Sequence, residues 1–215
     1  MTCNSIEYTV NQLFKIANPR GNLRYSIIMD EAVKQVIIKF KESDARIIFR
    51  LVEDNIWYDL LGDKGEELKW INNSRDTYKI PVLFWVNEDL PFICIKGDKE
   101  VVFNGDIISS SFFMLSRWEE RMIQEKDVHG RFRFIDSIAY KHNFITIPIV
   151  DEYAMILRKY LQLLFQNTDL GNNKFSIKLS HDIDDIRRFI NSSTAIKTLS
   201  GDLIKEEILS YLLNQ

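Results

Sequence analysis

The residues with the most evident chemical potential form an acidic run, S-H-D-I-D-D, at residues 180–185. Alternating apolar residues at 175–179 predict a strand that leads directly into this run. Because side chains alternate along a strand, Asp182 and Asp184 would share one face, ~7 Å apart. Two such carboxylates could bind a divalent cation, or one could hold the metal while the other acts as a base. Strand ends are also where α/β folds place ligands.

The same run also has an interpretation without chemistry. Acidic residues at a strand end are often solvated loop residues or helix caps, and residue types alone favour this interpretation over a metal site. His181 would lie on the opposite face of the strand from Asp182, where a histidine more often packs than binds a ligand. The spacing of the acidic residues therefore leaves both interpretations open.

Helices are the first elements that must position these residues. Apolar residues at helical intervals predict one helix at 6–17 and another at 107–124, which Asp106 would cap. A further helix is predicted at 152–166 with Asp151 as its cap. All three helices have one apolar stripe, so each is expected to pack against a common core.

Extended segments are predicted where apolar and β-branched residues gather between turn signals, at 23–29, 45–52, 80–86, 92–95, 100–103 and 144–150. A Gly-Asp turn at 97–98 favours a hairpin between two of them. The segment 53–79 is mixed and polar and is expected to be irregular, with one short helix or hairpin. Together these patterns predict an α/β fold with a mixed sheet flanked by helices.

Composition excludes several classes of protein. The chain has 215 residues, of which 46% are hydrophobic and 27% charged, as expected for a globular protein with a core. A net charge of −3 gives no basic excess for binding nucleic acid. No apolar stretch approaches the ~20 residues of a membrane span, and no signal peptide is evident, so a cytoplasmic location is expected. Cys3 and Cys94 are too few for a disulfide scaffold, and Cys94 is expected to be a buried thiol.

Residues 175–185 resemble the opening strand of the polysaccharide deacetylases, carbohydrate esterases of family four with a distorted (β/α) barrel. Three stretches upstream resemble an uncharacterised domain that precedes such deacetylases in bacterial proteins associated with surface-polysaccharide loci. These stretches are D-I-I-S-S-S-F-F-M-L-S-R-W-E-E at 106–120, D-x-H-G-R-F at 127–132 and P-I-V-D-E-Y at 148–153.

The resemblance implies an accessory α/β domain at 1–173, followed at 174–215 by the incomplete start of a barrel-type deacetylase domain. It also implies that Asp182 is the general base and Asp184 a metal ligand. The family's two aspartates are commonly adjacent, whereas Ile183 separates them here, so Asp185 is the alternative ligand. The implied reaction removes acetyl groups from an acetylated glycan. Zinc would polarise the acetyl carbonyl and a water molecule, and the aspartate would take a proton from that water.

The sequence departs from the deacetylase pattern in its histidines. A catalytic zinc site needs three protein ligands, and the family supplies two of them from a His-x-x-x-His-type motif downstream of the first strand. No histidine follows His181 in the 215 residues, and His129 and His142 lie upstream. We therefore expect no cofactor in this chain by itself and no activity of the fragment. Zinc or another divalent cation is implied only for a complete deacetylase domain.

A non-enzymatic module that binds a glycan or a protein partner is the alternative function. Four aromatic residues of the polar segment could stack on sugar rings or on a partner, although such residues more often belong to the core: Trp57, Tyr58, Trp70 and Tyr78. An apolar stripe near the C-terminus predicts possible self-association: Ile204, Ile208, Leu209 and Leu212.

One further charged group surrounds the predicted helix at 107–124. It comprises Arg117, Glu119, Glu120, Asp127 and Arg131. An ion-pair network that supports the structure is the favoured interpretation, and a ligand site at the join between domains is the other.

Overall fold

The computed structural model describes residues 1–61, 67–87, 89–172, 176–180 and 196. The chain divides into two units, Met1–Asn173 and Lys174–Gln215. His181, Asp182, Asp184, Asp185 and the apolar stripe at 204–212 lie outside the described residues. Among the helices that the structure describes, none is long and apolar enough to cross a bilayer.

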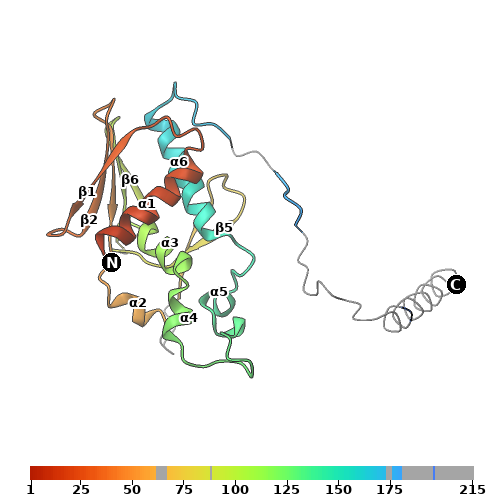
Figure 1. The fold of residues 1–215 in the computed structure, drawn as a ribbon. Helices are drawn as coiled ribbons and strands as arrows, with labels where there is room; N and C mark the ends of the chain where they lie inside the picture. Colours follow the sequence, from red (N-terminus) through yellow and green to blue (C-terminus); the bar gives the residue numbers. More distant parts are fainter. Residues whose placement is uncertain (62–66, 88, 173–175, 181–195, 197–215) are drawn as a thin grey trace. The chain divides into compact units, whose positions relative to one another are not determined.

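A five-stranded mixed sheet forms one side of the first unit (Figure 1). Its strands, in spatial order, are β1 (Tyr25–Asp30), β2 (Gln35–Phe40), β3 (Arg46–Arg50), β7 (Glu100–Phe103) and β6 (Ile93–Lys96). The pairs β1–β2, β2–β3 and β6–β7 are antiparallel, whereas β3 and β7 are parallel. The predicted mixed α/β fold is confirmed, and so is the predicted hairpin of β6 and β7.

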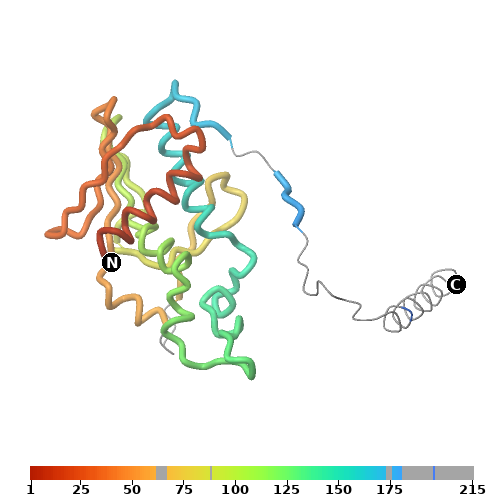
Figure 2. Tube along the Cα trace, in the orientation of Figure 1, coloured from red at the N-terminus to blue at the C-terminus, as the bar shows by residue number. Residues whose placement is uncertain are grey.

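Three helices pack on the same side of this sheet: α1 (Cys3–Ala17), α3 (Ile107–Leu115) and α6 (Ile149–Leu164). Helices α1 and α6 are far apart in sequence but lie side by side, as Figure 2 shows. The core between sheet and helices is rich in aromatic residues, for example Phe49 on β3 and Phe103 on β7, whose ring centroids are 4.9 Å apart. This packing buries one face of the sheet.

The opposite face of the sheet has an apolar row of residues beside a charged row. Strand register aligns Ile28, Ile37, Ile48, Val102 and Cys94 directly across all five strands. A neighbouring row consists of Ser26, Lys39, Arg46, Glu100 and Lys96, in which Arg46 pairs with Glu100. The long charged side chains shield part of the apolar row, since Val102 is buried and Ile37 and Ile48 are half-buried.

A smaller antiparallel sheet of β4 (Lys69–Asn72) and β5 (Lys79–Val82) lies in the connection between β3 and β7, after the short helix α2 (Ile56–Asp59). The predicted strand at 80–86 was too long, because it ends at Val82 and only Trp85 makes a further bridge, to Gly105. Strand β2 was not anticipated from the sequence. Its apolar residues are interrupted by Lys39 and follow a charged turn.

The predicted helix at 107–124 is two helices, α3 and α4 (Trp118–Met122). Arg117 separates them with a left-handed backbone, at φ 52°. A left-handed residue ends a helix because its successor cannot continue the i to i−4 hydrogen bonds. The chain therefore turns between α3 and α4 although neither glycine nor proline marks the break.

The start of α6 also differs from the prediction. The helix begins at Ile149 with Pro148 as its N-cap residue, so Asp151 lies in the first turn and does not cap it. The predicted extended segment at 144–150 is also wrong, because residues 144–148 contain a turn and residues 149–150 already belong to α6. Proline suits a helix start, since its ring fixes φ and its missing N–H needs no partner there, and acidic residues in the first turn favour the helix dipole. Before α6 lie a 3-10 turn at Phe134–Asp136 and α5 (Ile138–Lys141).

The described part of the second unit contains no strand. Residues 176–180 have no regular structure, and Leu179 is 93% exposed. The predicted strand at 175–179 is therefore wrong for the described residues. A strand gains stability from paired neighbours and from burial of one face, and these residues have neither. No start of a (β/α) barrel is present among the described residues of this unit.

Candidate functional site

Two neighbouring pockets lie near the point where the parallel strands β3 and β7 end. Leu51, Val52 and Asp54 follow β3, and Asp106 and Ser109 follow β7. In parallel α/β sheets, the carboxyl ends of neighbouring strands bring two loops together at one edge, where ligands commonly bind. We therefore take this edge as the candidate functional site.

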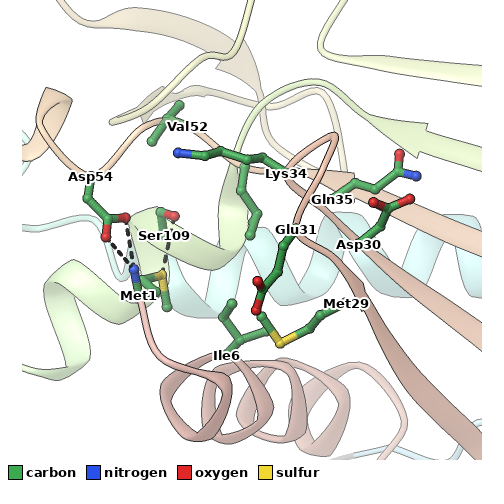
Figure 3. Close-up of a pocket in the computed structure, with 11 residues that line it drawn as sticks. Met1, Ile6, Met29, Asp30, Glu31, Lys34, Gln35, Val52, Asp54 and Ser109 are labelled. Carbon is green, nitrogen blue, oxygen red and sulfur yellow. Dashed lines mark hydrogen bonds and ion pairs between the residues drawn. The ribbon is translucent and has the colours of Figure 1, made fainter.

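The first pocket, here called the polar pocket, has a volume of about 300 Å³ (Figure 3). Its lining comprises Met1, Ile6, Met29, Asp30, Glu31, Lys34, Gln35, Leu51, Val52, Asp54 and Ser109. The turn between β1 and β2 supplies Glu31 and Lys34, and helix α1 supplies Ile6. The pocket thus joins a hairpin, a helix and the ends of two strands.

The charges of the polar pocket are largely paired. The amino group of Met1 donates to both oxygens of Asp54, at 2.8 and 2.7 Å, as Figure 3 shows. Lys34 forms an ion pair with Glu53. The Asp54 side chain is 73% exposed, so solvent screens its ion pair with Met1. In the described residues, no three His, Cys, Asp or Glu side chains are grouped to hold a metal ion. The polar pocket is therefore suited to hydrogen bonding and charge recognition.

Beneath the polar pocket, Asp106 ties the two strand ends together. Its Oδ2 accepts a hydrogen bond from the Val52 N–H at 2.8 Å, and its Oδ1 accepts one from the Ser109 N–H at 2.8 Å. The bond to Ser109 caps α3, as the sequence predicted. The bond to Val52 crosses from β7 to β3 and was not foreseen. Val52 and Ser109 both line the pocket, so Asp106 fixes part of its wall.

Complete burial raises the pKa of Asp106 to about 6, although its hydrogen bonds with Ser109 and Val52 lower it. Burial favours the neutral acid, and N–H donors favour the carboxylate. Burial is the larger effect here. The hydroxyl group of Tyr153 is equally enclosed and donates to the Pro81 carbonyl at 2.7 Å. Asp106 thus joins the start of α3 to the segment after β3, and Tyr153 joins α6 to β5 of the smaller sheet.

The second pocket, here called the aromatic pocket, has a volume of about 270 Å³. Its lining comprises Met1, Thr2, Ser5, Asp54, Trp57, Tyr58, Phe112 and Trp118. Since Met1 and Asp54 line both pockets, the two lie next to each other. The lining thus combines four aromatic rings with the hydroxyl groups of Thr2 and Ser5 and the carboxylate of Asp54.

Trp57 is the centre of the aromatic wall. It is 4% exposed, and its ring stacks on Phe84 with centroids 5.5 Å apart. Trp118 meets Trp57 edge to face at 5.5 Å, and Tyr58 meets Trp118 edge to face at 5.1 Å. The left-handed Arg117 directs the chain so that Trp118 reaches α2. The rings thus form a continuous series from the core to the exposed Tyr58.

The four aromatic residues singled out in the sequence have different environments. Trp57 belongs to the core, and Tyr58 is exposed at the aromatic pocket. Trp70 and Tyr78 are exposed on the smaller sheet and its turn, away from both pockets, and Tyr78 hydrogen-bonds Glu152. The structure therefore brings only Trp57 and Tyr58 together, and adds Phe112 and Trp118 from α3 and α4.

The charged group around α4 consists of separate local interactions. Arg117 pairs with Glu120, and Arg131 pairs with Asp127 at 3.0 Å. Glu119 is buried and accepts a hydrogen bond from the Ile138 N–H at 2.7 Å, which ties α4 to α5. Burial raises the pKa of Glu119, whereas hydrogen bonding to Arg117 lowers that of Glu120. These contacts fix turns and helix ends, so the group supports the structure, but as two separate ion pairs and one buried hydrogen bond and not as the predicted network.

The histidines and cysteines of the described residues do not gather at the pockets. His129 is exposed in the turn after Asp127, and His142 is half-buried at the end of α5, where burial lowers its pKa. Cys3 is exposed and Cys94 is half-buried near Asn104, so the prediction of a fully buried Cys94 was wrong. Cys94 lies on the less covered face of the sheet, which explains its partial exposure.

The residues predicted to be catalytic and metal-binding, Asp182 and Asp184, lie outside the described residues. Of the residues that line the pockets, Trp57 and Tyr58 were singled out in the sequence as possible stacking residues, and Asp106, beneath the polar pocket, was predicted as a helix cap. Asp54 and Trp118 gave no signal of a shared site, because they are 64 positions apart and approach only through the fold.

Comparison with known proteins gives one match. Residues 2–166 match DUF7033, a family of unknown function. No curated protein matches the chain, and no solved structure matches it. The matched range includes every lining residue of both pockets except Met1, and it ends before the acidic run at 180–185.

Proposed function

The chain belongs to the DUF7033 family, and from this premise we propose that it is the N-terminal part of a polysaccharide deacetylase-like protein. Residues 1–173 would form the accessory domain, and residues 174–215 would begin the deacetylase domain. In the complete protein, Asp182 would act as the general base and Asp184 or Asp185 as a metal ligand. The substrate would be an acetylated glycan.

One observation carries this proposal, namely the position of the acidic run. S-H-D-I-D-D at 180–185 follows the region that matches DUF7033 and lies in the second unit of the chain. This order is the one expected of an accessory domain followed by the first strand of a deacetylase domain. The run is also the part of the sequence that resembles a known catalytic motif.

The 215 residues do not contain the downstream histidine pair that the resembled deacetylases use as zinc ligands. Catalytic zinc sites have three protein ligands and one open position. The acidic run provides carboxylates and His181, whereas His129 and His142 belong to the first unit. In the described residues no metal-binding group is formed. Any deacetylase chemistry therefore needs ligands from further along a longer protein.

The gene sequence beyond the codon for Gln215 tests this proposal. We expect the reading frame to continue and to encode a His-x-x-x-His-type motif within about one further strand and helix, ~30 residues, the scale of one β-strand and its following helix. A stop codon directly after Gln215, or a long continuation without such histidines, would contradict the proposal. The second outcome would also assign the acidic run to a solvated loop.

A non-enzymatic binding module is a second candidate function, and the aromatic pocket favours it. Exposed and half-exposed rings beside hydroxyl groups are suited to bind a glycan or a protein partner. Under this proposal, residues 1–173 act through recognition alone. Substitution of Asp182 would then have no effect on function, whereas the first candidate predicts loss of acetate release by the complete protein.

A further inference from the structure

We infer that the aromatic pocket binds a neutral pyranose ring of a glycan, with the ring stacked on Tyr58 beside Trp118 and its hydroxyl groups directed toward Asp54 and Ser5. This inference rests on the glycan-binding form of the proposed function and assigns it to a site. It concerns recognition in the first unit and requires no chemistry at Asp182.

The lining of the pocket provides both kinds of surface that a sugar ring needs. A pyranose has an apolar face of C–H groups and a polar edge of hydroxyl groups. Tyr58, Trp118 and Phe112 supply aromatic ring faces and edges. Asp54, Thr2 and Ser5 supply hydrogen-bonding oxygens. Few ligand classes combine these two surfaces in one small ring, and a purely aliphatic ligand would leave the polar rim unpaired.

The polar rim is held in place by the start of α1. Thr2 is the N-cap residue, and its Oγ1 accepts a hydrogen bond from the Ser5 N–H at 3.3 Å. The Ser5 hydroxyl donates to the Thr2 carbonyl at 2.8 Å. Asp54 is already an acceptor, since the Met1 amino group donates to it. A carboxylate can accept several hydrogen bonds, so a sugar hydroxyl can share Asp54 with Met1.

The aromatic wall is formed in advance of any ligand. Trp118 is half-buried against Trp57 and against Phe113, whose ring centroid is 5.7 Å away. These contacts restrain the Trp118 ring, so that little rotational freedom would be lost on binding. Tyr58 is 58% exposed and presents its ring to solvent beside Trp118. The indole N–H of Trp57 is enclosed and has no hydrogen-bond partner among the described residues.

The size of the pocket limits the ligand. Its volume of about 270 Å³ is at the lower end of the ~300–1,000 Å³ of pockets for drug-sized ligands. One monosaccharide unit fits this space, and neighbouring units of a chain would extend from it. The adjacent polar pocket shares Met1 and Asp54 and would offer space for a neighbouring unit.

Titration of residues 1–215 with tri-N-acetylchitotriose and with cellotriose tests the inference, by calorimetry and by tryptophan fluorescence. We expect binding of at least one sugar in the millimolar range or tighter, with a change in tryptophan emission. Tyr58→Ala should weaken binding about five- to tenfold, the loss of one stacking contact. Trp118→Phe keeps a ring in the core and should weaken binding by less.

Trp70→Ala is the matched control, since Trp70 is an exposed aromatic residue that does not line the pocket. It should leave sugar affinity unchanged, and circular dichroism should show all variants folded. Absence of binding by both sugars, or equal affinity of Tyr58→Ala and the unsubstituted protein, would overturn the inference. An equal loss in Trp70→Ala would do so as well. None of these results bears on the reading frame after Gln215, so failure here is distinct from failure of the deacetylase proposal.

Discussion

The polar and aromatic pockets share Met1 and Asp54 but are built in opposite ways. In the polar pocket, long charged side chains of the β1–β2 turn and of the segment after β3 pair with each other near solvent. In the aromatic pocket, the rings continue inward to Trp57 and Phe84 of the core. Exposed ion pairs are weak and change partner readily, whereas rings packed on a core keep their positions. The aromatic pocket is therefore the better prepared of the two for a ligand.

The difference also concerns what lies beneath each pocket. Asp106 underlies the polar pocket and joins two backbone segments through its carboxylate. Trp57 underlies the aromatic pocket and joins α2 to α3 and α4 through ring contacts. Substitution of either buried residue should affect stability strongly, and substitution of the residues above it should not. The following predictions test this contrast, from the largest expected effect to the smallest.

Trp57→Ala should have the largest effect. Removal of a buried tryptophan leaves a cavity beside Phe84, Phe113 and Trp118, and such substitutions cost ~3–5 kcal/mol of unfolding free energy. Urea denaturation followed by circular dichroism measures this loss. Trp70→Ala, at an exposed ring, should cost far less. A loss below ~1 kcal/mol for Trp57→Ala would show that the ring series is not anchored in the core.

Asp106→Ala should come next. The substitution leaves the Val52 and Ser109 N–H groups without their acceptor, one of them at a helix N-cap. We expect a loss of about 2–4 kcal/mol in unfolding free energy. Asp106→Asn retains one acceptor oxygen and should lose less. If the alanine variant were as stable as the unsubstituted protein, Asp106 could not be the group that joins β3 to β7.

The titration of Asp106 should make stability depend on pH. Its folded pKa of about 6 lies above its ordinary value of 3.8. A raised folded pKa contributes stability that is fully present below the unfolded pKa and is lost as pH rises through the folded one. The unsubstituted protein should therefore lose stability relative to Asp106→Asn as pH rises from 4 to 6.5, by on the order of 2 kcal/mol of unfolding free energy.

Denaturation of both proteins at several pH values measures this difference. Glu119 shares the direction of shift, because burial raises its pKa too, and remains in both proteins. The comparison with Asp106→Asn removes its contribution. A difference that stays constant with pH, or grows as pH rises, would contradict the assignment to Asp106.

Asp54→Asn should have the smallest effect on stability. Asp54 is 73% exposed, and its pairing with Met1 is screened by solvent. We expect a change within the ~0.5 kcal/mol scatter of surface substitutions. Sugar binding at the aromatic pocket should nevertheless weaken, because the strongest acceptor of the rim is lost. A large loss of stability would mean that the polar pocket is as firmly built as the aromatic one.

Local patterns in the sequence were sufficient for several elements of the fold. Asp106 before an apolar stripe indicated the start of α3, and the Gly-Asp turn indicated the hairpin of β6 and β7. The mixed sheet also followed from the alternation of predicted strands and helices. These features depend on residues within a few positions of each other, so the sequence alone defines them.

Features that depend on distant residues were not accessible in the same way. The hydrogen bond from Val52 to Asp106 joins residues 54 positions apart, and it exists only because β3 and β7 are parallel neighbours. Arg117 carries no sign in its residue type of the left-handed turn that brings Trp118 to Trp57. Trp57 and Trp70 are the same residue type in the same polar segment, yet only one of them is buried.

The central claim is that residues 1–173 are the accessory part of a deacetylase-like protein whose deacetylase domain begins at 174–215. Acetate release from an acetylated oligosaccharide tests this claim most directly. The protein encoded by the extended reading frame and the chain of residues 1–215 would be assayed side by side with added zinc. We predict release by the extended protein, none by residues 1–215, and loss of activity in the extended Asp182→Asn variant. Zinc-dependent release by residues 1–215 alone, or full activity of the extended Asp182→Asn variant, would contradict the account.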